Sequence, residues 1–172
     1  MIFLTVGTQS FQFNRLLEAV DNLIDEKIIQ ETVIAQIGES TYVPRNYLAY
    51  PFLDSSEFSR LMGECDLLIT HSGVGTILEG LSANKRIIVV PRRKDYREHV
   101  DDHQEEIADK FGEQGSICVC KDVNKLGECY QHVRRSTPQT MEIRLNYSNT
   151  ANFVNGYLES LNQSRKKVTA WR

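Results

Sequence analysis

The sequence lacks an excess of basic charge. Its 172 residues include 20 lysines and arginines against 23 aspartates and glutamates, which gives a formal net charge of -3. Proteins that bind nucleic acids usually present a basic face, because contacts with the phosphate backbone supply much of their affinity. We therefore expect no nucleic acid among the partners of this chain.

Long hydrophobic runs are also missing. The chain opens with MIFLTVGT, which has no basic stretch ahead of it and is too short for a signal peptide or a membrane-spanning helix. We expect a protein that is soluble on its own and that reaches a membrane only through a partner. The length and the 41% of hydrophobic residues suit a single compact domain with a sizeable core.

Cysteines are few, and none belongs to a C-x-x-C pair. The four are Cys65, Cys118, Cys120 and Cys129, and no histidine lies at zinc-ligand spacing from them. We expect free and largely buried thiols, with no metal site. Cys118 and Cys120 alternate in an apolar run and are predicted to share one face of a strand. Reduced cysteines are typical of the cytoplasm.

Short apolar runs alternate with amphipathic segments along the chain, a pattern typical of an α/β fold with a parallel sheet and helices on both faces. The run DLLIT at 66–70 is uninterrupted, as expected of a strand covered on both faces. We predict one domain over residues 1–163 and a basic, flexible tail at 164–172. The expected strands are 2–6, 32–37, 48–50, 66–70, 86–90 and 116–120, and the expected helices are 16–28, 54–62, 76–83, 107–111, 123–133 and 146–161.

The loop after the strand 66–70 has the features of an anion-binding turn. Gly73 and Gly75 allow close approach of the backbone to a ligand, and a helix follows at once. Free N–H groups and the positive helix end favour a phosphate there. A bare G-x-G pattern is equally compatible with a tight turn that binds nothing.

Two common phosphate-binding loops are excluded by what this loop lacks. It has no Gly-Lys-Ser/Thr sequence, so it is not the P-loop of an ATPase. The third glycine of a dinucleotide fingerprint would fall at Leu78, and the loop follows an internal strand, so NAD binding is disfavoured.

The side chains around the two glycines point to a nucleotide. His71 can donate to a phosphate oxygen, and Ser72 and Thr76 add hydroxyl groups beside the helix start. Glu79 lies one turn beyond Thr76 on the same helical side, and a carboxylate there suits the two hydroxyl groups of a ribose. The competing interpretations are a structural histidine for His71 and a solvated carboxylate for Glu79.

The pattern His71-x-Gly73-x-x-Thr76-x-x-Glu79 resembles the nucleotide-sugar signature of GT-B glycosyltransferases. That signature is shared by plant-type UDP-glycosyltransferases and by the C-terminal domain of glycosyltransferase family 28. Two further blocks fit, residues 5–8 (TVGT) and residues 91–104 (PRRKDYREHVDDHQ), and the likeness spans roughly residues 1–120. The chain is similar to stand-alone versions of that domain. Examples are the PssE-type subunits of bacterial exopolysaccharide synthesis and the catalytic subunit of the two-subunit eukaryotic UDP-N-acetylglucosamine transferase.

The resemblance implies a Rossmann-like sheet equivalent to the donor-binding half of a GT-B enzyme, and a role for each matching residue. Ser72 stands where many relatives have a second glycine, and a small hydroxyl should be tolerated there. The implied contacts are His71, Ser72, Gly73, Gly75, Thr76, Gly7 and Thr8 for the diphosphate, Glu79 for the ribose, His103 and Gln104 for the sugar, and Phe52 and Leu53 for the uracil.

The resemblance further implies an inverting transfer of a hexose-type sugar from a UDP-sugar, with no metal and no other cofactor. It implies a membrane-anchored partner subunit that binds the acceptor, a lipid-linked saccharide, at the cytoplasmic face of the membrane. No residue of this chain is assigned as the general base, which could lie on the partner. Segment 146–161 and the tail are candidates for docking on that partner.

Two other functions, and the role of one basic run, stay open at this point. The chain could be a non-catalytic sensor or scaffold that binds a UDP-sugar. It could also be another enzyme on the same sheet, such as a sugar-nucleotide epimerase, although 172 residues are short for that class. The basic run of Arg92, Arg93, Lys94 and Arg97 is expected to be a solvated surface, or else to hold phosphates or an anionic lipid headgroup.

Overall fold

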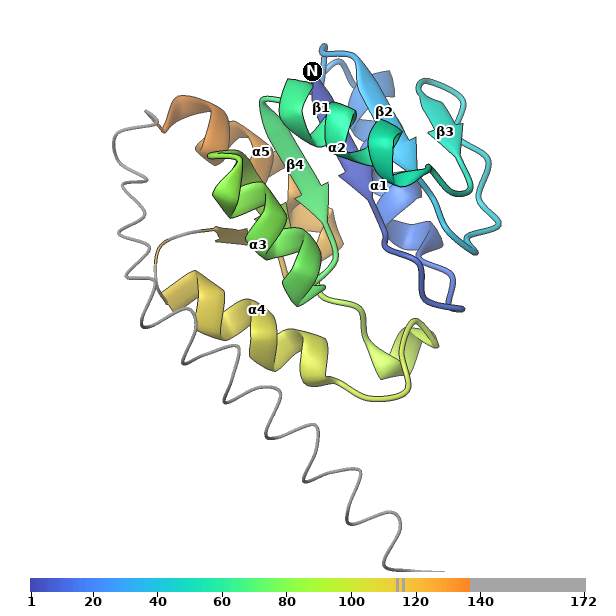
Figure 1. Cartoon of the computed structure of the whole chain (residues 1–172), viewed down its shortest axis with the longest axis vertical. Helices are drawn as coiled ribbons and strands as arrows, with labels where there is room; N and C mark the ends of the chain where they lie inside the picture. Colours follow the sequence, from blue (N-terminus) through green and yellow to red (C-terminus); the bar gives the residue numbers. More distant parts are fainter. Residues whose placement is uncertain (114, 116, 137–172) are drawn as a thin grey trace, which may run out of the picture. The chain divides into compact units, whose positions relative to one another are not determined.

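The computed structural model describes residues 1–113, 115 and 117–136 (Figure 1). The predicted helix at 146–161, the basic tail and the proposed docking segment lie outside the described residues. Within the described part, no helix is both long enough and apolar enough to cross a membrane.

Six parallel strands form one sheet in the order β3-β2-β1-β4-β5-β6. This is the strand order of the doubly wound nucleotide-binding fold, so the predicted Rossmann-like sheet is confirmed. The strands are β1 (Ile2–Thr5), β2 (Val33–Gln36), β3 (Leu48–Tyr50), β4 (Leu67–Thr70), β5 (Arg86–Val89) and β6 (Cys118–Val119).

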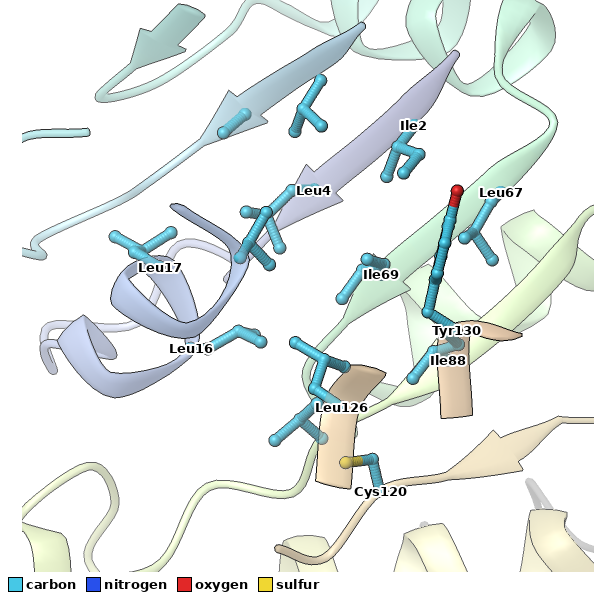
Figure 2. Packing of buried hydrophobic residues seen from close by; sticks show 14 of the residues in the cluster. Ile2, Leu4, Leu16, Leu17, Leu67, Ile69, Ile88, Cys120, Leu126 and Tyr130 are labelled. Carbon is cyan, nitrogen blue, oxygen red and sulfur yellow. The ribbon is translucent and has the colours of Figure 1, made fainter. Parts of the chain in front are cut away.

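Helices cover both faces of the sheet (Figure 1). On one face, alternate strand residues such as Leu4 and Ile69 join residues of α1 and α5 in a continuous apolar cluster (Figure 2). On the other face, Phe3 packs edge-on against Phe58 of α2, with ring centroids 5.1 Å apart. The helices are α1 (Asn14–Asp25), α2 (Ser55–Glu64), α3 (Val74–Ser82), α4 (His103–Glu113) and α5 (Leu126–Arg135), with short 3-10 turns at Lys94–Tyr96 and Val123–Lys125.

Burial on both faces explains why β1 and β4 read as unbroken apolar runs. All residues of both strands are buried. Gly80 of α3 lies so close to the sheet that a Cβ there would be 2.7 Å from a methyl group of Leu68. The helix therefore packs directly on the strand that carries the central loop, and this fixes the position of that loop.

Several predicted boundaries differ from the structure: for example, α1 ends at Asp25 and not at residue 28, and α4 begins at His103 and not at residue 107. Helix α3 begins at Val74, not at residue 76, so Gly75 lies inside its first turn. Strand β6 has only two residues, Cys118 and Val119. The helix expected at 123–133 begins as a 3-10 turn and becomes α-helical at Leu126. In contrast, the predicted cap of α2 is confirmed, since a carboxylate oxygen of Asp54 accepts a hydrogen bond of 2.9 Å from the N–H of Glu57.

A buried carboxylate anchors the polar segment that leads into β3. Asp21 of α1 is fully buried and accepts hydrogen bonds from the Tyr42 hydroxyl (2.8 Å) and from the N–H groups of Arg45 (2.9 Å) and Asn46 (3.0 Å). Burial alone would raise the pKa of Asp21, but these hydrogen bonds lower it on balance. The segment is thereby held against α1 and delivers β3 and the chain beyond it to one side of the site.

Candidate functional site

A cavity of about 570 Å³ opens at the carboxyl ends of β1 and β4. From β1 the chain runs outward to β2 and β3, then returns to β4 beside β1 and continues in the opposite direction. Ligands of open α/β sheets bind at such a reversal point. The cavity therefore lies where the fold itself predicts a binding site.

Eight of the twelve predicted site residues line this cavity, although they come from three separate loops and one helix. They are Gly7, Thr8, Leu53, His71, Gly73, Gly75, Thr76 and Glu79. The other four do not line it. They are Phe52, Ser72, His103 and Gln104.

Two of these four are exposed and two are buried behind the loop. Phe52 has 50% of its surface exposed. His103 starts α4, has 47% of its side chain exposed and lies 3.3 Å from a carboxylate oxygen of Glu106. Ser72 and Gln104 are buried. Of the predicted uracil contacts, Leu53 lines the cavity and Phe52 does not, and neither predicted sugar contact lines it. The predicted diphosphate and ribose contacts all line it except Ser72.

His71 is held by hydrogen bonds that set its tautomer. The Thr70 hydroxyl donates to the carbonyl oxygen of Thr5 (3.0 Å) and lies 3.3 Å from Nδ1 of His71. Because the hydroxyl hydrogen is used on Thr5, we assign the ring hydrogen to Nδ1, which donates to the Thr70 oxygen. The unprotonated Nε2 then lies on the side of Gly7 and Gly73.

The two glycines next to the ring are required by space. A Cβ on Gly73 would be 2.3 Å from Nε2 of His71, and a Cβ on Gly7 would be 2.6 Å from its Cε1. Gly7 also has a φ of +78°, which side chains rarely adopt. These glycines bring the backbones of two loops onto the imidazole, so that His71 forms part of the cavity wall.

Burial lowers the pKa of His71 to about 3, and the positive charge of Arg92 adds to the effect. Only 6% of the residue is exposed. In the absence of a ligand the imidazole is therefore neutral at physiological pH.

This neutral histidine predicts a pH dependence of stability. Between about pH 6.5 and 3 the unfolded chain binds a proton at His71 that the folded chain does not bind. This contribution to stability is complete above pH 6.5 and is lost as the pH falls, by up to about 1.4 kcal/mol per pH unit. In urea unfolding, we expect the wild type to lose about 2 kcal/mol more than His71→Gln between pH 7.5 and pH 5.0. Equal losses in the two proteins would contradict a buried neutral imidazole.

The first turn of α3 presents backbone donors without a side-chain cap. The N-cap residue is Gly73, which has no side chain to cap the helix. The first hydrogen bond within the helix runs from the N–H of Ile77 to the carbonyl oxygen of Gly73. The N–H groups of Val74, Gly75 and Thr76 therefore have no partner within the helix. Such a helix end attracts an anion, through both the free N–H groups and the helix dipole.

Glu79 lies on the same helix and lines the same cavity. Its side chain is exposed, and within the described ranges it makes no ion pair or hydrogen bond. A free carboxylate one turn from an anion-binding helix end would repel a second anion but can accept hydrogen bonds from neutral hydroxyl groups. The cavity therefore combines an anion site with an acceptor for hydroxyls.

Gln36 is a cavity residue that the sequence did not single out. It ends β2, is 3% exposed, and its side-chain oxygen accepts a hydrogen bond of 3.1 Å from the N–H of Leu53. Its amide nitrogen lies 3.4 Å from the Thr5 hydroxyl. The sequence feature that could have identified Gln36 is its position as a polar residue near the end of the apolar run TVIAQI. Because the N–H of Leu53 is already paired, that residue can offer a base only its apolar side chain and its carbonyl oxygen.

Gln104 connects the loops that follow β4 and β5. Its side-chain oxygen accepts hydrogen bonds from the N–H groups of Ser72 (3.3 Å) and Arg92 (3.1 Å). Both partners are donors, so the orientation of the amide is determined. The hydroxyl oxygen of Ser72 is buried and has no hydrogen-bond partner among the described residues. Gln104 thus positions the His71–Gly75 loop from behind.

The structure corrects the expectation that Arg92 belongs to a solvated basic surface. Its guanidinium is fully buried and donates to the carbonyl oxygens of Val6 (2.7 Å), Phe11 (3.0 Å), Gln12 (3.1 Å) and Glu98 (3.1 Å). Burial lowers the pKa of Arg92 to about 10, so it stays charged at neutral pH. Arg92 therefore joins the loop after β1 to the loop after β5, and is not free to hold a lipid headgroup.

Glu98 balances this buried charge. Its carboxylate is 1% exposed and forms a two-pronged ion pair with Arg15 of α1, with distances of 2.8 and 3.0 Å. It also accepts the N–H of Arg93 at 3.1 Å. This pairing could not be predicted from the sequence, because the partners are 83 residues apart.

The cavity has few side chains that could act as ligands of a metal ion. The ionisable side chains that line the cavity are His71 and Glu79. Throughout residues 1–113, 115 and 117–136, no group of three or more histidine, cysteine, aspartate or glutamate side chains could hold a metal.

Comparison with known proteins assigns this chain to a family. The sequence profile of the glycosyltransferase family 28 C-terminal domain matches residues 1–155. The chain belongs to this family. The resemblance inferred from the sequence motifs is confirmed at this level, whereas the narrower likeness to exopolysaccharide subunits of the PssE type stays a prediction.

The relatives with similar sequences include a subunit of one N-acetylglucosamine transferase and the whole chain of another. The chain is 33% identical over 129 residues to the human UDP-N-acetylglucosamine transferase subunit ALG13, which covers 70% of this chain and 11% of that protein. It is 29% identical over 125 residues to a UDP-N-acetylglucosamine–N-acetylmuramyl-(pentapeptide) pyrophosphoryl-undecaprenol N-acetylglucosamine transferase of Prochlorococcus marinus, which covers 66% of this chain and 33% of that enzyme. The chain thus spans a third or less of these two relatives.

Solved structures show the same fold. MurG of Acinetobacter baumannii superimposes with a TM-score of 0.57 at 21% identity, over 80% of this chain and 42% of that one. The solution structure of ALG13 gives 0.54 at 23% identity, over 86% of this chain and 91% of that one. The glycosyltransferase of kitacinnamycin gives 0.63 at 16% identity, over 81% of this chain and 36% of that one. The sheet therefore has the fold of the C-terminal half of GT-B glycosyltransferases.

Proposed function

We propose that this family 28 domain binds a UDP-sugar as the donor half of a two-component glycosyltransferase. The transferred group is a hexose-type sugar, and the acceptor is a lipid-linked saccharide of polysaccharide or glycan biosynthesis. Both relatives described above are transferases of N-acetylglucosamine, and this makes UDP-N-acetylglucosamine the first donor to test.

One observation carries this proposal: the uncapped end of α3 and the carboxylate of Glu79, which is unpaired among the described residues, share a cavity at the reversal point of the sheet. A phosphate alone would need only the first feature. A ligand that places a diphosphate next to two hydroxyl groups needs both, and a nucleoside diphosphate has that arrangement.

The roles then follow from position. The N–H groups of the first turn of α3, with Gly73, Gly75 and Thr76, hold the diphosphate, and Gly7 and Thr8 complete its surroundings. His71 lies beside them, and its Nε2 must take up a proton before it can donate to a diphosphate oxygen. Glu79 accepts the ribose hydroxyls. Leu53 packs against the uracil, with Phe52 beside it at the rim. His103, at the start of α4, is the proposed sugar contact, whereas Gln104 and Ser72 lie behind the loop, where Gln104 holds it in place.

For the reaction, the helix end stabilises the negative charge that grows on the leaving UDP. No metal ion is required for that step, because the backbone donors and the helix dipole face the diphosphate directly. The acceptor hydroxyl needs a general base. We place this base on the acceptor-binding partner, because the proposed roles use both ionisable residues of the cavity, His71 and Glu79, to contact the donor.

The partner is proposed to be a membrane-anchored subunit that binds the lipid-linked acceptor at the cytoplasmic face. A donor domain alone covers only one side of the reacting sugar. The matched region covers a third or less of the two curated relatives described above, and we propose that a separate subunit binds the acceptor.

Titration calorimetry against UDP, UDP-N-acetylglucosamine, GDP and dTDP conjugates tests this proposal. We expect Glu79→Ala to weaken binding of UDP ligands about 10- to 100-fold, because hydrogen bonds to a charged group are worth roughly 1.5–3 kcal/mol. Stability should not change, since the side chain is exposed and unpaired within the described part of the chain.

Glu18→Ala, which removes another exposed helical glutamate, is the matched control and should leave binding intact. Unchanged affinity in Glu79→Ala would exclude the ribose contact. Tight binding of UDP-sugars, but no sugar transfer with the partner and acceptor present, would instead identify a sensor or scaffold.

A further inference from the structure

Gln36 is a buried polar residue at the end of β2, on the wall of the donor cavity. Only 3% of its surface is exposed. It lines the cavity together with Leu53, which is half-buried. A buried amide is costly unless its polar atoms have partners, so the partners of Gln36 indicate what it does at the site.

The amide of Gln36 connects two loops of the site. Its Oε1 accepts a hydrogen bond of 3.1 Å from the N–H of Leu53, and its Nε2 lies 3.4 Å from the Thr5 hydroxyl. Only the amide oxygen can accept from an N–H, so the orientation of the amide is determined. The Thr5 hydroxyl also accepts from the N–H of Gly7 at 3.3 Å. Gln36 therefore links the segment after β3 to the loop after β1.

The backbone of Leu53 is held on both sides. Before it, the carbonyl oxygen of Pro51 accepts a hydrogen bond of 2.8 Å from the N–H of Gly38, and after it Asp54 caps α2. The N–H of Leu53 is used on Gln36, whereas its carbonyl oxygen accepts no hydrogen bond from the described residues. The backbone of Leu53 can therefore offer a ligand an acceptor but no donor.

A lone acceptor distinguishes between two nucleobases of equal size. Uracil carries an N–H at ring position N3, and this group can donate to a carbonyl oxygen. Cytosine carries a lone pair at the same position, which a carbonyl oxygen repels. Packing against the apolar side chain of Leu53 does not separate the two bases, so the discrimination depends on the free polar groups of its backbone.

We propose that Gln36 determines the base specificity of the donor site: by holding the N–H of Leu53, it makes the site select uracil over cytosine. Gln36 acts through Leu53 and is a positioning residue. This inference rests on the function proposed above, because it requires a nucleoside diphosphate whose base lies against Leu53.

Calorimetric titrations of the wild-type chain test the selection itself. The ligands are UDP, CDP and UDP methylated at N3 of the base. We expect UDP to bind at least about tenfold more tightly than either of the others, because both leave the Leu53 carbonyl oxygen without a donor. If CDP or the methylated UDP binds within about threefold of UDP, the selection is absent although the donor function stands. Failure of every nucleotide to bind would overturn the proposed function as well.

Two variants test the part played by Gln36. Gln36→Met removes the amide at similar length, and Gln36→Asn keeps an amide that is too short to reach Leu53. Either change frees the N–H of Leu53, which can then donate to the ring nitrogen of cytosine. We expect the ratio of the CDP to the UDP dissociation constant to fall at least about fivefold in each variant. Gln36→Glu retains an acceptor for this N–H and should keep the wild-type ratio, even where its charge weakens both nucleotides.

Gln104→Met is the matched control. Gln104 is 4% exposed and also holds a loop backbone through its side-chain oxygen, but it accepts from Ser72 and Arg92, not from Leu53. Its loss should weaken UDP and CDP by the same factor. An unchanged ratio in Gln36→Met or Gln36→Asn would show that Gln36 only supports the fold, and would overturn the proposal. If one of these two variants does not fold, the other decides.

Discussion

Replacement of Arg92 by methionine should destabilise the fold by about 3–5 kcal/mol, the largest loss expected from any single change discussed for this chain. The guanidinium is fully buried and satisfies four carbonyl oxygens, those of Val6, Phe11, Gln12 and Glu98. It also stacks on the ring of Phe13 with 4.8 Å between its central carbon and the ring centroid. Methionine would fill part of the volume but would leave these oxygens buried without donors.

Electrostatics add to this loss. The change would remove the attraction between the Arg92 guanidinium and the Glu98 carboxylate, although Glu98 would keep its ion pair with Arg15. The loop after β1, which lines the donor cavity, would also lose its tie to the loop after β5. We therefore expect donor binding to weaken in the same variant, as measured at a temperature where the protein remains folded.

Arg93→Met is the matched control for Arg92→Met. Arg93 is the next residue, but its side chain is 36% exposed and forms an ion pair of 3.0 Å with Glu105, a pair that is itself partly exposed. Such pairs contribute about 0–1 kcal/mol. Urea unfolding should separate the two variants clearly. A loss of less than about 1 kcal/mol in Arg92→Met would show that the buried network is not what holds the loops.

Gly75→Ala should separate ligand binding from folding. Gly75 is in the first turn of α3, and a Cβ at this position would have no heavy atom within 4 Å in the structure. Alanine stabilises a helix relative to glycine by up to about 1 kcal/mol, so the variant should unfold at a slightly higher temperature. A close approach of a ligand to the backbone would explain why glycine, and not alanine, stands at position 75. We expect UDP affinity to fall about 10- to 100-fold, and further in Gly75→Val, because the added carbon atoms occupy the place of the diphosphate.

Gly63→Ala provides the control for this prediction. Gly63 is also helical, in α2, and a Cβ there would likewise meet nothing within 4 Å. It does not line the donor cavity. Both alanine variants should gain stability in calorimetric melts, but only Gly75→Ala should lose binding in titrations with UDP. If Gly75→Ala binds UDP as well as Gly63→Ala does, the first turn of α3 is not the diphosphate site.

Local sequence determined the elements and the central loop of this protein. The unbroken apolar runs of β1 and β4 specify strands that are covered on both faces, and the cap of α2 depends on two residues three positions apart. The spacing from His71 to Glu79 lies within one loop and one helix, so its geometry is nearly fixed by the chain itself. These features depend on contacts between near neighbours, which is why they could be predicted.

Long-range packing decided the rest. Gln36 and Leu53 meet because β2 and the segment after β3 end at the same edge of the sheet. Arg92 looked like one member of a surface run, yet its partners come from loops 80 or more residues earlier in the chain as well as from Glu98 nearby. A buried charge is tolerated only where such partners converge, and convergence is a property of the tertiary fold.

The same distinction applies to the loop from Thr70 to Gly80. The sequence determined that it carries glycines, a histidine and a glutamate at the spacing of a nucleotide-sugar site. Tertiary structure decided that the helix starts early enough to place Gly75 in its first turn, and that His71 lies between two glycine backbones. It also decided that Gln104 supports the loop from behind and does not line the cavity. The physical reason is that each of these depends on where a distant backbone lies, and no local pattern encodes that position.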